Sequence, residues 1–213
     1  YLMDTIQRMK PGNLIFLNGS SSAGKTTLAM MLQQLLPEPY QHIALDQFRD
    51  GLPGRYQGLN SPEGAPGARG LNVVPVMRDE QLITEVRFGD HGERVLHGMR
   101  RAIAAFARVG NHVIIDDLLF KPDYLRDYAE TLDGLDVWMI GVRCSIDVVN
   151  ARESQRPGRF PGTATSHYHQ VHAHGGEYDL EVDTSYASPR SCAELIIERL
   201  KTPPVALRNV LRG

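Results

Sequence analysis

Short runs of almost entirely apolar residues recur along the chain. A strand that is covered on both faces carries apolar residues at successive positions, so these runs predict buried strands. We expect strands at residues 14–17, 42–45, 112–115, 137–143 and 178–182. Most of these strands are apolar on both faces, which is typical of a parallel sheet.

Between these runs, apolar residues recur at the three- and four-residue spacing of a helix. Helices are expected at residues 26–36, 93–109, 123–132, 145–153 and 189–200. The first stops before Pro37, the second ends at Gly110, and Ser145 is suited to cap the fourth. Strands separated by helices predict an α/β fold, a three-layer sandwich with a central, mostly parallel five-stranded sheet.

Residues 51–92 interrupt this pattern. The part from 51 to 70 is rich in glycine and proline and too polar for a core element, so it predicts a loop or insertion. Residues 71–76 and 81–88 suit a small hairpin or flap, and Gly89 begins a turn. A chain of 213 residues suits one domain. We therefore expect a single domain over residues 1–213, with a substrate-side insertion at 51–92.

Composition narrows the possible partners. Hydrophobic residues make up 42% and charged residues 23% of the chain, and the net charge of −2 gives no basic field for gripping nucleic acid. We find neither an apolar run of about 18 residues nor a charged-then-apolar leader, so no membrane partner is expected. Cys144 and Cys192 show no CxxC spacing, which fits a cytoplasmic protein. The sequence carries no sign of oligomeric state.

The segment that follows the first strand satisfies the phosphate-binding pattern GxxxxGK[ST]. Small residues let the backbone N–H groups point inward, and the start of a helix adds partial positive charge. The segment is therefore expected to bind a polyphosphate, and this interpretation is favoured over a glycine-rich turn with a surface lysine. Lys25 should reach the terminal phosphates of ATP, and Thr26 should bind Mg²⁺. The expected nucleotide-binding residues here are Gly19, Ser20, Ser21, Ser22, Ala23, Gly24, Lys25, Thr26 and Thr27.

Carboxylates follow two other strands. Asp46 ends the second predicted strand, where it can accept the proton of an attacking hydroxyl, although a helix cap or loop aspartate is the alternative. Asp116 and Asp117 follow the apolar run 113–115, as in a Walker B acidic site. One of the two should orient Mg²⁺, because adjacent strand residues point to opposite faces, and the sequence leaves open which.

Two further clusters lie towards the carboxyl end. Arg152, Arg156 and Arg159 occupy "ARESQRPGRFPG", a segment that suits a lid over residues 152–165 closing on a triphosphate, although exposed arginines are common at helix ends. The other cluster is "HYHQVHAH", residues 167–174, whose histidine spacing matches no metal frame. We expect these histidines near a site mouth, with His172 able to touch substrate.

Several motifs occurring in order resemble one known family. They are "LNGSSSAGKTTLA", "LLPEPY", "ALDQF", "VIIDDLLF", "GVRCSIDVVNARESQRPGR" and "VHAHGGEYDLEVDTSYASPRSCA". Together they are similar to the chloramphenicol phosphotransferase-like family of P-loop kinases, over most of the chain from Leu14 to Leu200. The resemblance implies a fold akin to shikimate and adenylate kinases and transfer of the γ-phosphate of ATP to a small-molecule hydroxyl.

The resemblance also implies roles for single residues. It matches Asp46 to the family's general base and Arg156 and Arg159 to its lid arginines, with Arg152 just before them. It places Asp183, Thr184 and Ser188 near the adenine. In the region 51–92 the chain departs from the family's namesake, so no acceptor-binding residues are carried over. Donors there that would suit a polyhydroxylated or anionic acceptor are Arg55, Tyr56, Asn60, Arg69, Asn72 and Arg87.

We therefore expect an ATP- and Mg²⁺-dependent O-phosphotransferase with a small hydroxylated acceptor. It could inactivate an antibiotic and so confer antibiotic resistance. Two alternatives stay open: a metabolite kinase acting on a sugar acid or nucleoside, and a non-catalytic ATP-binding regulator. A regulator needs neither the strand-end Asp46 nor an arginine-bearing lid, which favours the enzyme.

Overall fold

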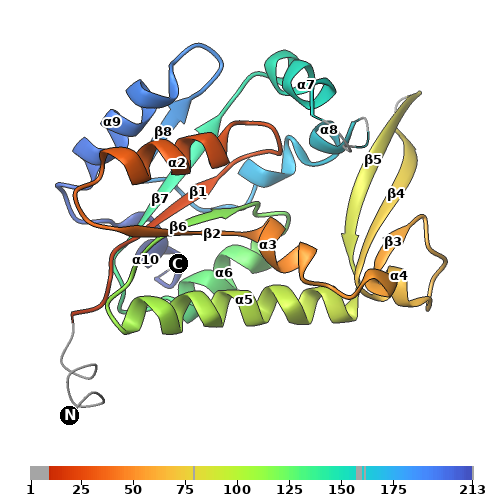
Figure 1. The fold of residues 1–213 in the computed structure, drawn as a ribbon, viewed down its shortest axis with the longest axis horizontal. Helices are drawn as coiled ribbons and strands as arrows, with labels where there is room; N and C mark the ends of the chain where they lie inside the picture. The colour runs from red at the N-terminus through yellow and green to blue at the C-terminus, as the bar shows by residue number, and fades with distance from the viewer. Residues whose placement is uncertain (1–9, 79, 157–159, 161, 213) are drawn as a thin grey trace.

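A central parallel sheet organises the molecule (Figure 1). The computed structural model describes residues 10–78, 80–156, 160 and 162–212. The sheet has the order β2-β6-β1-β7-β8, and every neighbouring pair is parallel. Its strands are β1 (Leu14–Asn18), β2 (Tyr40–Ala44), β6 (His112–Asp117), β7 (Val137–Arg143) and β8 (Leu180–Asp183). The predicted α/β fold with a five-stranded sheet is confirmed, and the sheet is wholly parallel rather than mostly so.

Helices cover both faces of the sheet. They are α2 (Lys25–Leu35), α5 (Asp90–Arg108), α6 (Pro122–Thr131), α9 (Pro189–Arg199) and α10 (Ala206–Val210). Leu14 and Phe16 of β1 pack into the layer that contains α5, α6 and α10. Ile15 and Leu17 pack into the opposite layer with α2 and α9. Each such side chain, fully buried, contributes about 1.5–3 kcal/mol, which explains why the first four positions of the strand are apolar.

Two local predictions are wrong. The second strand ends at Ala44, and α3 (Leu45–Asp50) begins at once, so Asp46 lies in the first turn of a short helix. The Gln47 side chain accepts a hydrogen bond from the Ala44 N–H at 3.1 Å and stabilises that helix start. Ser145 precedes α7 (Ile146–Ser154), but its side chain makes no capping hydrogen bond. Its own N–H instead donates to Ser185 Oγ at 2.7 Å.

The interruption at 51–92 forms a second sheet beside the end of α5 (Figure 1). It contains β3 (Gln57–Leu59), β4 (Leu71–Arg78) and β5 (Gln81–Phe88), with the short helices η1 (Gly54–Tyr56) and α4 (Pro66–Arg69) beside them. The predicted hairpin is confirmed, because β4 and β5 pair antiparallel from Leu71↔Phe88 to Arg78↔Gln81. Strand β3 pairs parallel to β4 at the edge of this sheet.

Two short elements that the sequence did not predict lie between α7 and β8 along the chain, and the first of them packs against β5. They are α8 (Thr163–His167) and η2 (Gln170–His172). Gly162, just before α8, lies so close to β5 that a Cβ there would come within 3.0 Å of Ile83 Cα. Its φ of +75° also favours glycine. Within the described residues, no helix is long and apolar enough to cross a membrane.

Candidate active site

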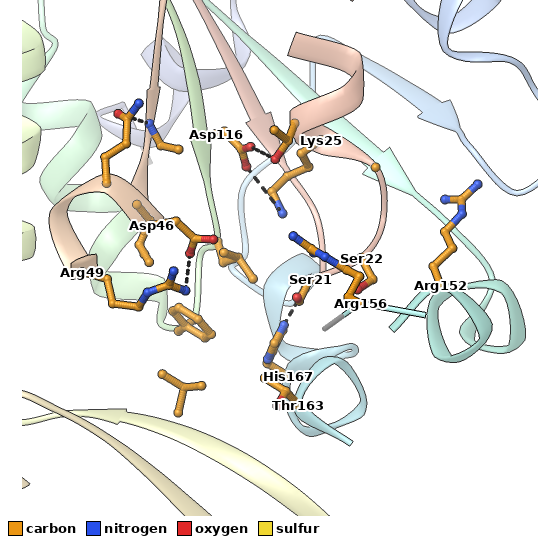
Figure 2. Close-up of a pocket in the computed structure, with 18 of the residues that line it drawn as sticks. Ser21, Ser22, Lys25, Asp46, Arg49, Asp116, Arg152, Arg156, Thr163 and His167 are labelled. Carbon is orange, nitrogen blue, oxygen red and sulfur yellow. Dashed lines mark hydrogen bonds and ion pairs between the residues drawn. The ribbon is translucent and has the colours of Figure 1, made fainter. Parts of the chain in front are cut away.

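A cavity of about 1350 Å³ lies between the carboxyl ends of the central strands and the hairpin sheet (Figure 2). Its walls come from four places. The phosphate loop and β6 form one wall, α3 a second, the end of α7 with α8 a third, and β3, β4 and β5 the fourth. In parallel α/β sheets, ligands bind outside the carboxyl ends of the strands, so the position of this cavity marks it as the candidate active site.

The phosphate loop turns between β1 and α2 through two residues with positive φ, Ser22 at 61° and Gly24 at 91°. Lys25 is only 6% exposed, and its Nζ donates to the carbonyls of Gly19 and Ser20 at 2.9 and 3.0 Å. The Ser22 hydroxyl is buried and has no hydrogen-bond partner among the residues that the structure describes. A buried hydroxyl without a partner is costly, so this loop is built to receive a ligand.

Not every loop residue faces the cavity. The residues that line it are Ser21, Ser22, Gly24, Lys25, Thr26 and Thr27. Gly19 is needed for packing instead, because a Cβ there would lie 2.4 Å from the Val142 carbonyl oxygen. The Ala23 carbonyl accepts from Thr184 Oγ1 at 2.7 Å, and Ser20 lines a smaller neighbouring cavity. Gly19, Ser20 and Ala23, which were predicted to bind the nucleotide, thus shape the loop without lining the main cavity.

Asp116 is the carboxylate that faces the loop. Its Oδ2 accepts from Thr26 Oγ1 at 2.8 Å, and its Oδ1 lies 3.7 Å from Lys25 Nζ. His42 Nε2 of β2 is 3.4 Å from the same carboxylate. Burial raises the pKa of Asp116, but the charge of Lys25, the nearby His42 and the hydrogen bond from Thr26 outweigh it and hold the pKa below its usual range. Asp116 is therefore ionised beside a hydroxyl and an ammonium group.

Asp117 points to the opposite face of β6 and away from the loop. Its oxygens accept from Tyr128 O–H at 2.6 Å and from the Leu118 N–H at 2.7 Å. Burial raises the pKa of Asp117 to about 6, against the lowering effect of those two hydrogen bonds. The prediction that one of the two aspartates would face the phosphates fits Asp116, and Asp117 belongs to the core under α6.

Asp46 stands across the cavity from the loop, on α3. Its Oδ1 accepts from Arg49 Nη1 at 2.7 Å, and its side chain is 44% exposed (Figure 2). The helix creates this pair, because residues three apart in a helix lie on the same face. Arg49 was not predicted, because the expected strand over 42–45 ended at Asp46 and no helix was expected after it. An aspartate and an arginine three residues apart were a signal for a helical pair.

Arg152 supports the loop from the side opposite Asp46. Its Nη2 donates to the Thr184 carbonyl at 2.7 Å, and its Nη1 lies 3.2 Å from Thr184 Oγ1. Because Thr184 also binds the Ala23 carbonyl, Arg152 and Thr184 together brace the phosphate loop. Asp183 lines the smaller cavity of about 420 Å³ rather than the main one, and its carboxylate accepts from the Ser185 N–H at 2.7 Å. Ser188 caps α9 by accepting from the Ser191 N–H.

The buried Glu153 joins the two ends of the segment predicted as a lid. This carboxylate is 6% exposed and accepts from the N–H groups of Gly162 and Ala164 at 3.0 and 2.8 Å. Arg156 is exposed and lines the main cavity, near Ser22 in Figure 2. Arg159 lies outside the described residues. Glu153 thus links α7 to α8 within the predicted lid segment, residues 152–165.

Strands β4 and β5 present apolar side chains to the cavity, which overturns the expected set of polar donors; Gln57 of β3, not among those donors, also lines it. The side chains facing the cavity include Leu71, Val73, Val86 and Phe88. None of the six donors expected there, all of them described residues, lines the cavity. Arg69 pairs with Asp90, Arg87 pairs with Glu85, and Asn72 holds the backbone of Ser61. Arg55, Tyr56 and Asn60 likewise lie away from the cavity lining.

The histidines of residues 167–174 do not act together. His172 Nδ1 and His174 Nε2 both contact the Tyr178 hydroxyl, at 2.7 and 2.8 Å, and Tyr178 also receives a hydrogen bond from Asn18 at the end of β1. Burial lowers the pKa of His172 to about 4. His167 instead lines the main cavity. Within the described part of the chain, no group of three or more His, Cys, Asp or Glu residues could hold a metal ion.

Comparison with known proteins supports this geometry. The family model described as chloramphenicol phosphotransferase-like protein matches residues 12–201. Proteins of two Mycobacterium tuberculosis strains, each named "Putative O-phosphotransferase", are 32% identical over 214 residues, covering 96% of this chain and 89% of theirs.

Among solved structures, the fold is similar to an APS kinase of Mycobacterium tuberculosis. That likeness has a TM-score of 0.61 and 15% identity, and it covers 90% of this chain and 99% of the other. A gluconokinase of Sinorhizobium meliloti aligns with a TM-score of 0.57 and 17% identity, covering 91% and 94%. At such identities the likeness concerns the fold alone. The family match, in contrast, spans nearly the whole chain, and the chain belongs to the chloramphenicol phosphotransferase-like family of small-molecule kinases.

Proposed function

We propose that the protein transfers the γ-phosphate of ATP to a hydroxyl of a small molecule. The observation that carries the proposal is the single cavity that joins a phosphate loop to a carboxylate: Lys25 and Ser22 lie on one wall and Asp46 on another. A regulator that only binds nucleotide has no need of a carboxylate facing the terminal phosphate across an open acceptor space. A kinase needs both.

The nucleotide half of the proposal rests on the loop. Three features of the loop favour a polyphosphate: the positive φ angles that turn its backbone, the start of α2, and the buried ammonium group of Lys25. The unpaired Ser22 hydroxyl adds a donor. Arg152 and Thr184, which brace the loop, border the far end of the cavity and would lie towards the ribose and base.

Thr26 and Asp116 would hold Mg²⁺. A hydroxyl and an ionised carboxylate 2.8 Å apart are oxygen ligands of the kind that Mg²⁺ prefers. When bound, the ion would offset the negative charge of the β- and γ-phosphates, as in other P-loop phosphotransferases.

The transfer step uses Asp46 and the cationic residues around the cavity. The acceptor oxygen forms a bond to the γ-phosphorus as the bond between that phosphorus and the β,γ-bridging oxygen breaks, and ADP leaves. The acceptor proton passes to the Asp46 carboxylate, which Arg49 orients at 2.7 Å. Lys25 stabilises negative charge on the phosphates, and Arg156, in the segment predicted as a lid, lines the same cavity and would add positive charge there. A closed lid excludes water, which would otherwise compete as acceptor.

The apolar hairpin wall narrows the class of acceptor. A sugar acid or nucleoside would leave its polar groups unpaired against Val73 and Val86 of that wall. A molecule with a hydroxyl at one end and an aromatic or alicyclic body at the other would place the hydroxyl near Asp46 and its body against the wall. Hydroxylated antibiotics of that shape fit better than polar metabolites, so we favour antibiotic inactivation over a metabolite kinase.

The test is ADP release with ATP and Mg²⁺ in the presence of two matched panels. One contains hydroxylated compounds with apolar bodies, chloramphenicol among them, and the other contains sugar acids, sugars and nucleosides. We expect a member of the first panel to raise ADP release above background in the wild type and not in Asp46→Asn. An acceptor from the second panel would reverse the choice of substrate class. ATP binding with no acceptor-dependent release in either panel would favour the regulatory role.

A further inference from the structure

His167 makes a contact with the phosphate loop that the proposed function does not use. It is the last residue of α8, and its Nε2 accepts a hydrogen bond from the backbone N–H of Ser21 at 3.1 Å (Figure 2). Ser21 lines the cavity within the loop. A side chain from a distant part of the chain therefore holds one of the N–H groups at the cavity surface of the phosphate loop.

The surroundings fix this imidazole in place. His167 is 4% exposed, and its ring lies edge-on to Phe120, with ring centroids 5.3 Å apart. Phe120 in turn packs against Phe88 of the hairpin wall at 5.9 Å. The start of α8 is tied to the buried Glu153 carboxylate. The ring has little room to swing away when a ligand enters.

The position of His167 places it at the acceptor end of the loop. Phe120 and Phe88 border the apolar acceptor space, whereas Arg152 and Thr184 border the loop at the opposite end. If ATP lies in the cavity as proposed, its terminal phosphate is the part nearest His167. The contact would therefore distinguish ATP from ADP.

The protonation of the ring must differ between the empty and the filled site. Because Ser21 N–H donates, Nε2 carries a lone pair and the hydrogen lies on Nδ1, which is 3.4 Å from Ser166 Oγ. Phosphate oxygens offer lone pairs and no hydrogen, so a lone pair on Nε2 would repel them. A hydrogen on Nε2 removes the conflict. If both ring nitrogens carry hydrogens, Nδ1–H can still donate to Ser166 Oγ, whose own hydrogen goes to the Thr163 carbonyl at 2.7 Å.

We propose that His167 contacts the terminal phosphate of bound ATP: its Nε2 accepts from the Ser21 N–H in the empty site and donates to the phosphate in the filled one. This inference rests on the proposed function, since it requires ATP in the main cavity. It adds a phosphate-binding residue that lies outside both the loop and the lid arginines.

The first test follows the ring directly. In protein labelled with ¹⁵N at histidine, the Nε2 resonance of His167, assigned by its loss in His167→Gln, should lie in the unprotonated range without ligand. It should move to the protonated range when a non-hydrolysable ATP analogue and Mg²⁺ saturate the site. An Nε2 that stays unprotonated in the saturated complex overturns the inference.

The second test compares affinities. His167→Leu should bind the ATP analogue about tenfold more weakly, because a hydrogen bond to a charged group is lost, and should change ADP binding by less than about threefold. His167→Gln, whose amide can donate from nearly the same place, should recover most of the loss. The matched control is His169→Leu, which alters an exposed histidine two residues away and should change neither affinity.

Two contrary results have different meanings. If His167→Leu binds the analogue as tightly as the wild type, or more tightly, His167 only fills the place of the phosphate and the inference is wrong while the proposed function stands. If the wild type itself binds neither analogue nor ADP, the proposed function fails, and this inference with it.

Discussion

The two sides of the main cavity differ in polarity. On the phosphate side, polar and charged groups lie close together. The Asp116 carboxylate is 2.8 Å from Thr26 Oγ1 and 3.7 Å from Lys25 Nζ. On the acceptor side, the hairpin turns its apolar residues inward and keeps its charges outside, as in the pair of Arg87 with Glu85. Under the proposed function, the phosphate side would recognise a charge that every nucleoside triphosphate carries. The acceptor side would recognise the shape of an apolar body.

The largest effect should come from removing the charge on the phosphate side. Lys25→Ala should lower kcat/KM by about 10³-fold or more, because the ammonium group stabilises charge on the phosphates during transfer. Steady-state kinetics measures this, with circular dichroism to check the fold. Lys121→Ala, which removes an exposed lysine paired with Glu93, is the control and should leave activity near that of the wild type. Comparable activity in Lys25→Ala would remove the basis for assigning the phosphates to this loop.

The second prediction concerns the two aspartates of β6. Burial raises the pKa of Asp117 above its unfolded value to about 6, so the folded state binds more protons than the unfolded state between about pH 4 and pH 6. The contribution of Asp117 to stability should therefore fall as pH rises through that window, by up to about 3 kcal/mol. Asp117→Asn cannot titrate there.

Urea unfolding at a series of pH values measures this. The free energy of unfolding of the wild type minus that of Asp117→Asn should decrease from pH 4 to pH 7. A difference that stays constant or grows would show that Asp117 is ionised throughout. Asp116→Asn provides the contrast: it should lower activity by about 10²-fold through the loss of the group facing Thr26.

The third prediction tests the acceptor side with adjacent residues of β4. Val73 lines the cavity, whereas Val74 is on the other face of the strand. Val73→Asn should raise the KM for the acceptor about tenfold, since apolar contact is lost and a polar group faces the acceptor body. The KM for ATP should not change. Val74→Asn is the matched control, and an equal rise in KM for both variants would contradict the assignment of the inner face.

The last prediction concerns His172, a half-buried residue that lines the smaller cavity together with Ser20 of the phosphate loop. Burial lowers the pKa of His172 to about 4, below its unfolded value of 6.5, so the neutral ring favours the folded state. That contribution is present above pH 6.5 and is lost as pH falls towards 4. Thermal unfolding should show His172→Asn losing less stability over this range than the wild type. Equal losses in both proteins would mean that His172 ionises freely in the folded state.

The phosphate side of the cavity could largely be predicted from the sequence, whereas the acceptor side could not. The phosphate loop, β1 and α2 are contiguous, so a local pattern was enough to place Lys25 and Thr26. The choice between Asp116 and Asp117 needed the face of β6 that turns towards α2, and that depends on packing. Asp46 was placed correctly on the cavity but on the wrong element, because an apolar run does not show whether a strand ends one residue sooner.

The acceptor side was beyond the sequence for a physical reason. Arg69 and Arg87 look like ligand donors when each residue is considered alone. In the structure they form ion pairs with Asp90 and Glu85 on the outer surface. Which face of a hairpin turns inward is decided by contacts far away in the sequence, here between β5 and α8. The cluster 167–174 was expected near a site mouth, but the contact of His167 with the phosphate loop could not be predicted, since Ser21 lies 146 residues away.

The account's central claim is that one cavity binds the nucleotide on one side and delivers its phosphate to a hydroxyl through Asp46 on the other. The most direct measurement follows the acceptor by mass spectrometry in a single turnover, in wild type and Asp46→Asn, with affinity for the ATP analogue measured on the same samples. We predict an acceptor heavier by one phosphate in the wild type, product formation slower by about 10²- to 10⁴-fold in the variant, and the same nucleotide affinity in both. Product formation at the wild-type rate in Asp46→Asn would contradict the claim.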